Sequence, residues 1–216
     1  MSLEYLVIEG NIGAGKTSLS KMLAADLNAE LLLERFTNNP FLAKFYDDPQ
    51  KYALPLELSF LKDRFSQSES IQKSIGTNSK MTISDYFFVK SLIFATCNLI
   101  GEEYTLYEEL FKIIYDRLPK PDLYVYLHLS EVRLIEHIQK RGREYEQTIK
   151  IDYLTAIKEQ YFNFFSRQND FPVLILHTDG LDFINKESDY QIIKDVIVNK
   201  KHKVPLSHYF FHSENT

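Results

Sequence analysis

Cysteine, tryptophan and long apolar segments are almost absent from this chain of 216 residues. Its one cysteine, Cys97, cannot form a disulfide within the chain, and this usage suits a reducing compartment. No apolar run approaches the roughly 20 residues that a membrane-spanning helix needs, and no basic segment precedes the first apolar run. We therefore expect a soluble, cytoplasmic protein.

Glycine and proline are also few, with seven residues of each, and the chain contains no obvious linker, repeat or low-complexity tract. The 25 Lys and Arg residues are outnumbered by 30 Asp and Glu, and the net charge of −5 argues against a nucleic-acid polymer as partner. Tyr and Phe are abundant instead, and most should lie in the core. The length fits a single domain over residues 1–216.

Apolar runs alternate along the chain with segments of helical spacing. Strands are expected at 4–9, 30–34, 80–84, 122–129 and 172–177. Helices are expected at about 16–27, 39–46, 56–75, 87–98, 103–118, 131–140, 151–167 and 187–200. Strands separated by helices predict an α/β fold, with a five-stranded parallel sheet, right-handed crossovers and a site at the carboxyl ends of the strands.

A glycine-rich motif of the form G-x-x-x-x-G-K-[ST] follows the first expected strand, as Gly10-Asn11-Ile12-Gly13-Ala14-Gly15-Lys16-Thr17. Backbone N–H groups of such a loop surround phosphate oxygens, Lys16 reaches the β- and γ-phosphates, and the Thr17 hydroxyl can ligate Mg²⁺. The helix that follows directs its positive end at the phosphates. The motif predicts a P-loop NTPase fold that binds a nucleoside triphosphate through Gly10, Asn11, Ile12, Gly13, Ala14, Gly15, Lys16, Thr17 and Ser18.

Two carboxylates stand at the ends of expected strands. Glu34 ends the second strand, where it would orient an attacking hydroxyl or take its proton; the alternative is a solvated loop residue. Asp85 follows the third strand, where it would help Thr17 to hold Mg²⁺; the alternative is a cap for the next helix. We expect both carboxylates at a phosphoryl-transfer site.

Two arginines flank a glycine at the end of the helix at 131–140, in Arg141-Gly142-Arg143. They suit a short lid, over about residues 141–149, that closes over a triphosphate and neutralises the migrating phosphoryl group. The alternative is a basic helix end favoured by the helix dipole. His208 and His212 have i, i+4 spacing but no ligand partners, so we expect surface residues rather than a metal site.

These segments, taken in order, resemble the deoxynucleoside kinase family. The resemblance covers nearly the whole chain and is strongest in residues 8–17, 46–49, 92–95 and 141–146. It implies that Glu34 faces the 5′-hydroxyl of a nucleoside and that Tyr46 and Glu146 hold its 3′-hydroxyl. It further implies that the base stacks on Phe94 and that Arg64 and the residue at position 57 read the edge of the base.

On the donor side, the resemblance implies that ATP is the phosphate donor. Arg141 and Arg143 would form the lid, and the turn at Asp179 would border the ATP adenine. Mg²⁺ would be held by Thr17 with Asp85 or Glu34. The resemblance also implies a homodimer that packs through the helices at 56–75 and 87–118.

The chain departs from the family pattern at four places. After the third strand the family has an acidic residue, Arg and Ser, but here Asp85 and Tyr86 leave no arginine. Lys90 stands where an aspartate usually contacts the base, Glu57 where a glutamine does, and His137 where a further lid arginine is expected. All four change the charge or the hydrogen-bonding pattern of the expected site.

Glu57 suggests a base preference. A glutamine offers one donor and one acceptor, which suits adenine or cytosine, whereas a carboxylate offers only acceptors. Guanine presents two adjacent donors, at N1 and at its 2-amino group, so we hypothesise that Glu57 favours deoxyguanosine. The alternative is that Glu57 pairs with Lys90 or Arg64 across the pocket and reads no base.

Three other classes share the phosphate loop. A GTPase switch needs an N-K-x-D segment, which the sequence lacks. A thymidylate-type nucleotide kinase wants an arginine near the end of the second strand, where Arg35 is available. A nucleotide-binding module without catalysis is the third alternative. We favour ATP- and Mg²⁺-dependent phosphorylation of the 5′-hydroxyl of a purine deoxynucleoside, either deoxyguanosine or deoxyadenosine, in nucleotide salvage.

Overall fold

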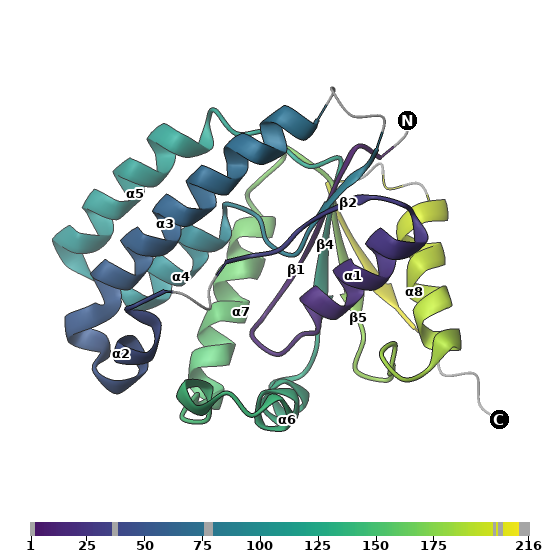
Figure 1. The fold of residues 1–216 in the computed structure, drawn as a ribbon. Helices are drawn as coiled ribbons and strands as arrows, with labels where there is room; N and C mark the ends of the chain where they lie inside the picture. Colours follow the sequence, from purple (N-terminus) through teal and green to yellow (C-terminus); the bar gives the residue numbers. More distant parts are fainter. Residues whose placement is uncertain (1–2, 36–38, 76–79, 201, 203–204, 212–216) are drawn as a thin grey trace.

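Residues 3–35, 39–75, 80–200, 202 and 205–211 are described by the computed structural model of the chain, and within them six parallel strands form one sheet (Figure 1). The strand order is β2-β3-β1-β4-β5-β6. The strands are β1 (Tyr5–Gly10), β2 (Glu30–Leu32), β3 (Thr82–Ser84), β4 (Leu123–His128), β5 (Val173–His177) and β6 (Leu206–Phe210). The predicted α/β class and parallel sheet are confirmed, with one strand more than predicted.

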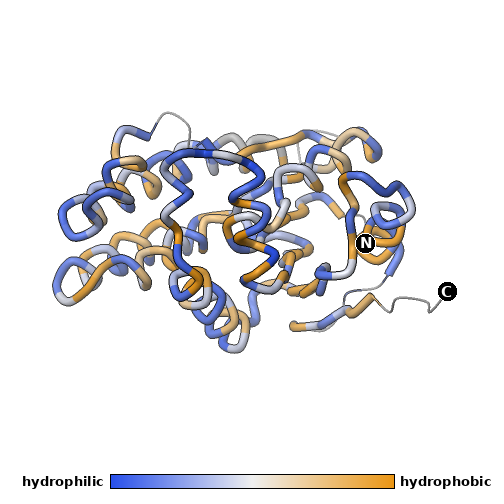
Figure 2. The backbone as a smooth tube through the Cα atoms, turned by 90° about the horizontal axis from the view of Figure 1, so that it is seen from below, coloured by the Kyte–Doolittle hydropathy of each residue, from blue (hydrophilic) through white to orange (hydrophobic). Residues whose placement is uncertain are grey.

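Helices cover both faces of this sheet (Figure 1). One face packs against α1 (Lys16–Asp26), α6 (Glu131–Arg141) and α8 (Glu187–Asn199). The other packs against α2 (Leu42–Asp47), α3 (Pro49–Ser74), α4 (Lys90–Asn98), α5 (Gly101–Tyr115) and α7 (Ile151–Phe165). Figure 2 shows hydrophilic and hydrophobic stretches alternating along the tube, as expected for helices with one buried face.

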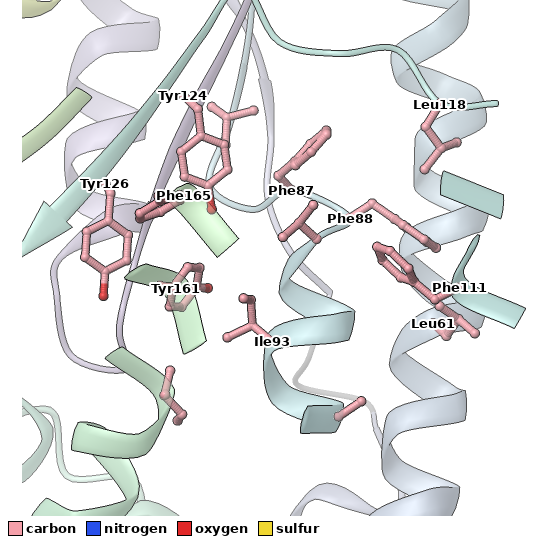
Figure 3. Close-up of a cluster of buried hydrophobic side chains, with 14 of the residues drawn as sticks. Leu61, Phe87, Phe88, Ile93, Phe111, Leu118, Tyr124, Tyr126, Tyr161 and Phe165 are labelled. Carbon is pink, nitrogen blue, oxygen red and sulfur yellow. The ribbon is translucent and has the colours of Figure 1, made fainter. Parts of the chain in front are cut away.

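Alternate residues of each central strand enter two separate cores. In β1, Tyr5 and Val7 join the core beneath α3, α4 and α7, whereas Leu6 and Ile8 join the core beneath α1 and α8. A parallel strand covered on both faces is apolar throughout, which explains why these strands were recognisable as continuous apolar runs. The first core is rich in aromatic rings, and Figure 3 shows Tyr124 and Tyr126 beside Phe165.

The missed strand β6 is an edge strand. Its residues alternate between exposed and half-buried, and the short segment mixes Leu206, Tyr209 and Phe210 with Ser207 and His208, so it lacks the continuous apolar run of the central strands. His208 lies within β6, and its Nδ1 is 3.1 Å from Nε2 of His177 on β5. This is a correction to its expected place in a polar tail; His212 lies outside the described residues.

The long helix α3 begins earlier than expected. A helix is expected at 56–75 from the sequence, but α3 starts at Pro49 and contains Pro55. Asp48 caps it by accepting from the backbone N–H of Lys51, and Pro49 occupies the first turn, where a missing N–H costs nothing. The helix therefore carries residues 57 and 64 on one rigid element.

Candidate active site

The glycine-rich loop connects β1 to α1 and lies against α6. Gly13 has a positive φ of 85°, and a Cβ there would lie 2.8 Å from the backbone oxygen of Leu134. The Lys16 ammonium donates to the backbone oxygens of Gly10 and Asn11, both at 2.9 Å. Burial and the nearby Lys90 lower the pKa of Lys16 to about 8. The loop thus concentrates backbone donors and one cation at a helix N-terminus.

Thr17 and Asp85 meet beside the loop. The Thr17 hydroxyl donates to Asp85 Oδ2 at 2.5 Å, and Asp85 Oδ1 accepts from the backbone N–H of Glu34 at 2.7 Å. Asp85 does not cap α4, which begins at Lys90 and has no side-chain cap. A hydroxyl and a carboxylate at one point are hard oxygen donors of the kind that Mg²⁺ accepts, so the residues fit this ion.

Glu34 is held between two cations. Arg64 donates to Glu34 Oε1 from Nε at 2.9 Å and from Nη2 at 2.6 Å, while Lys90 Nζ lies 2.5 Å from Oε2. The Glu34 side chain is only 10% exposed, which excludes the alternative of a solvated loop residue. Burial alone would raise the pKa of Glu34, but the charges of Lys90 and Arg64 lower it to about 2. Glu34 is therefore an ionised acceptor and a weak base.

Positions 85 and 86 carry no cation, and the two cations that contact Glu34 lie on α3 and α4. Tyr86, at that place, is buried with 1% exposure. Arg64, expected at the base edge, binds Glu34 and also donates to the Ser91 hydroxyl at 2.8 Å. Lys90, expected as a base contact, binds Glu34 as well. Neither pairing was predictable from spacing, because 30 and 56 residues separate the partners.

Glu57 is buried close to this charge cluster, but its hydrogen bond is to Asn98 and not to a residue of the cluster. Its side chain is on α3, and its Oε1 accepts from Asn98 Nδ2 at 2.7 Å. Its Oε2 is buried and has no hydrogen-bond partner among the described residues. No ion pair joins Glu57 to Lys90 or Arg64 in that part of the chain, so the expected alternative of a direct pair across the pocket is not what the structure has.

The two lid arginines converge on Glu146. Arg141 lies at the end of α6, Gly142 follows in the left-handed region at φ 71°, and Arg143 Nη1 lies 3.1 Å from Glu146 Oε1. Arg141 Nη2 binds the other carboxylate oxygen. His137, which replaces a further lid arginine, has its Nδ1 2.9 Å from the backbone oxygen of Gly13. Both arginines are thus ion-paired with Glu146 at one point beyond the end of α6.

These side chains line one cavity of about 120 Å³. It brings together residues from the loop, both strand ends, α2, α3, α4 and the lid, namely Lys16, Thr17, Glu34, Tyr46, Glu57, Arg64, Asp85, Lys90, Phe94, Arg141, Arg143 and Glu146. Asp179 is not among them; it follows β5 and accepts from the backbone N–H of Ser130 at 2.8 Å.

Asn98 and Tyr153 also line the cavity, and neither was predicted from the sequence. The position of Asn98 could have been predicted from spacing. Lys90, Phe94 and Asn98 are spaced i, i+4 and i+8, so they share one face of α4. Tyr153 lies in the first turn of α7. Its approach to the cavity depends on how α7 packs against α4, which spacing does not reveal.

The sheet order and the loop define an α/β protein of the P-loop NTPase class. The family model for deoxynucleoside kinases matches residues 6–202. The chain belongs to the deoxynucleoside kinase family, whose members are phosphotransferases, and the resemblance expected from sequence is confirmed. Among the described residues, no helix is long and apolar enough to cross a membrane.

Several named deoxynucleoside kinases align with nearly the whole chain. It is 32% identical over 202 residues to deoxyguanosine kinase of Bacillus subtilis, covering 90% of this chain and 98% of that protein. It is 34% identical to deoxyguanosine kinase of Lactobacillus acidophilus, with coverage of 94% and 92%. It is 28% identical to deoxyadenosine/deoxycytidine kinase of B. subtilis, with coverage of 91% and 93%.

Solved structures share the fold. Deoxyadenosine kinase from M. mycoides, with the products dCMP and a flexible dCDP bound, superposes with a TM-score of 0.79 over 91% of this chain and 100% of that chain. The sequence identity is 23%. The same enzyme with bound dATP superposes with a TM-score of 0.74.

Proposed function

We propose that the protein transfers the γ-phosphoryl group of ATP to the 5′-hydroxyl of a deoxynucleoside, with a purine favoured, in nucleotide salvage. The observation that carries this proposal is the position of Glu34. Its carboxylate is held by Arg64 and Lys90, and it lines the same cavity as Lys16 and Thr17 of the phosphate loop. An acceptor hydroxyl at Glu34 would therefore face the terminal phosphate of a triphosphate in the loop.

The donor side would be assembled from three parts. The loop from Gly10 to Ser18 would hold the phosphates, and Thr17 with Asp85 would hold Mg²⁺, which neutralises phosphate charge when bound. Arg141 and Arg143 would move from Glu146 onto the phosphates as the lid closes and would stabilise the charge spread over the transferred group.

Glu34 would act by orientation. A carboxylate whose pKa is about 2 takes a proton poorly in the ground state, but it is a strong hydrogen-bond acceptor. It would align the 5′-hydroxyl for in-line attack and receive its proton late, after the bond to the leaving oxygen has largely broken. Of the two roles expected from sequence, orientation fits the charges around Glu34 better than general-base catalysis.

The acceptor is proposed to be a nucleoside rather than a nucleotide. A 5′-phosphate would meet the carboxylate of Glu34, whereas a neutral hydroxyl would not. Arg35, the arginine that a nucleotide kinase would use, is exposed and does not line the cavity. Tyr46 and Glu146 line the same cavity and would hold the sugar 3′-hydroxyl when the lid arginines release Glu146.

The base would lie on Phe94 with its edge toward Glu57. Because a carboxylate offers acceptors only, its ionised form suits the N1–H and 2-amino donors of guanine, and we propose deoxyguanosine as the preferred substrate near neutral pH and above. Relatives at 32% and 34% identity are deoxyguanosine kinases, which supports a purine. A second hollow of about 830 Å³ shares Tyr46 and Asn98 with the cavity, and the nucleoside would enter through it.

We further propose a cytoplasmic homodimer in which each chain forms one kinase domain over residues 1–216 with a lid at about 141–149. The helix α5 supports a dimer, because Leu106, Leu110 and Ile113 are 52%, 37% and 60% exposed on one face at helical spacing. Phe65 on the adjacent α3 is 41% exposed. An apolar face of this kind is costly in water and is covered when two copies pack.

A coupled ADP-release assay with the four deoxynucleosides, and with their 5′-monophosphates as rival acceptors, tests the proposal. We expect turnover with deoxynucleosides and Mg²⁺ and none with monophosphates. The variant Glu34→Ala should lose about 10²- to 10⁴-fold in kcat while its ATP affinity is unchanged. ATP binding by the wild-type chain without turnover of any acceptor would favour a nucleotide sensor instead.

A further inference from the structure

Glu57 has two carboxylate oxygens in different situations. Oε1 accepts the amide N–H of Asn98 at 2.7 Å, and Oε2 is buried without a hydrogen-bond partner in the described part of the chain. A buried polar oxygen without a partner costs free energy, so it marks a place where a ligand atom completes the hydrogen bonding. Glu57 lines the cavity in which we place the base, and its side chain is 1% exposed.

We propose that Glu57 Oε2 selects the base by its own protonation, as an acceptor for purines with N1–H and, when protonated, as a donor for purines with a bare N1. The ionised form then takes guanine or hypoxanthine, and the protonated form takes adenine. The preferred base would therefore change with pH, and the change would depend on the protonation of Oε2 alone. The inference rests on the proposed deoxynucleoside kinase activity and adds a regulation of its substrate choice.

Asn98 determines which oxygen carries the proton. Because Asn98 Nδ2 donates to Oε1, that oxygen must remain an acceptor, and in the acid form the proton goes to Oε2. Oε1 keeps a second lone pair in both forms, which can take the 2-amino group of guanine. Asn98 is thus a positioning residue. Because it occupies Oε1, protonation of Glu57 changes Oε2 from an acceptor into a donor.

The surroundings of Glu57 make this change available near neutral pH. Burial raises the pKa of Glu57 to about 7. The negative charge of Glu34 also raises this pKa, whereas the positive charges of Arg64 and Lys90 lower it. The groups that interact with it from each packed element are Arg64 on its own helix, Glu34 after β2, Lys90 and Cys97 on α4, Tyr46 on α2, Tyr107 on α5 and Tyr153 on α7. The protonated share falls as the pH rises through this value.

The proposal has a quantitative signature. If guanine uses only the ionised form and adenine only the protonated form, the ratio of their kcat/KM values follows the ratio of the two forms. That ratio changes about tenfold for each pH unit, whatever the value of the pKa. Effects of pH on ATP, Mg²⁺ or the phosphoryl transfer act on both substrates and cancel in the ratio.

The experiment measures kcat/KM for deoxyguanosine, deoxyinosine and deoxyadenosine on the wild-type enzyme from about pH 5.5 to about pH 8.5. We expect the guanosine-to-adenosine ratio to rise about tenfold per pH unit over the middle of this range. Deoxyinosine has N1–H but no 2-amino group, so it should follow deoxyguanosine. A ratio that changes less than about twofold across the range overturns the inference while leaving the kinase activity intact.

Two variants sharpen the result. Glu57→Gln keeps its amide oxygen on Asn98 and places an N–H donor where Oε2 was, so its ratio should favour deoxyadenosine and become independent of pH. Glu102→Gln removes an exposed carboxylate at the start of α5 and should keep the wild-type slope. A pH-dependent ratio in Glu57→Gln contradicts the proposal. The wild-type slope alone decides it if that variant fails to fold, and absence of turnover with any nucleoside would refute the proposed function itself.

Discussion

Lys90 Nζ lies 2.5 Å from Glu34 Oε2, while Arg64 holds the other oxygen of the same carboxylate. This relationship gives Glu34 a second cation, although the sequence has no arginine directly after the third strand. This second cation comes from the first turn of α4, only five residues further along the chain than Asp85. Its effect is to keep Glu34 ionised and fixed beside the phosphate loop.

Removing the Lys90 charge should weaken catalysis more than folding. In Lys90→Met, Glu34 keeps Arg64 but loses one charge-assisted hydrogen bond, and a positive charge disappears from the cavity. We expect kcat/KM to fall about 10²-fold and the free energy of unfolding to fall by about 1–3 kcal/mol. Steady-state kinetics and thermal unfolding measure these changes, and Lys90→Arg should recover most of the activity. Equal activity in the methionine variant would remove Lys90 from this role.

Much of this site was visible in the sequence because each part lies next to a strand end or in a local motif. The loop at 10–17, Glu34 and Asp85 needed only apolar runs and turn chemistry. The partners of Glu34 were different. Arg64 and Lys90 lie on α3 and α4, and their ion pairs with Glu34 depend on how those helices pack, which no local pattern encodes. Edge strand β6 escaped for a related reason, since it buries too little to have a strong apolar pattern.

Asp85 provides a prediction about magnesium. Its carboxylate touches the Thr17 hydroxyl, and we propose that both ligate the ion. Asp85→Asn keeps the size of the side chain but removes the negative charge that the pair offers to the metal, so the Mg²⁺ concentration needed for half-maximal activity should rise about tenfold or more. A magnesium titration at saturating ATP measures this value. Asp63→Asn, in a partly exposed ion pair with Lys62, serves as control and should not change it.

The apolar face of α5 provides a prediction about assembly. Leu110→Glu places a charge within the exposed stripe that includes Leu106 and Ile113, and a charge buried between two copies without a partner is strongly unfavourable. We expect the variant to sediment as a monomer at concentrations where the wild type is a dimer. Ile192→Glu on α8, also at an exposed apolar position, is the matched control and should stay dimeric. Dimers of both variants would place the interface elsewhere.

The stability of the protein should record the protonation of Glu57 independently of catalysis. Burial raises the pKa of Glu57 from 4.5 to about 7, so the folded state binds the proton more tightly than the unfolded state does. The stability conferred by this proton is therefore complete below about pH 4.5 and is lost as the pH rises through about 7. Glu57→Gln carries no titrating group there and should lose nothing over the same window. Its free energy of unfolding should thus gain about 3 kcal/mol relative to wild type between pH 4.5 and pH 7.5 or above.

Urea unfolding at a series of pH values measures the difference, with Glu102→Gln as control. A difference that stays constant with pH would show that Glu57 is ionised throughout, and the pH-dependent choice of base would then have no source in this residue.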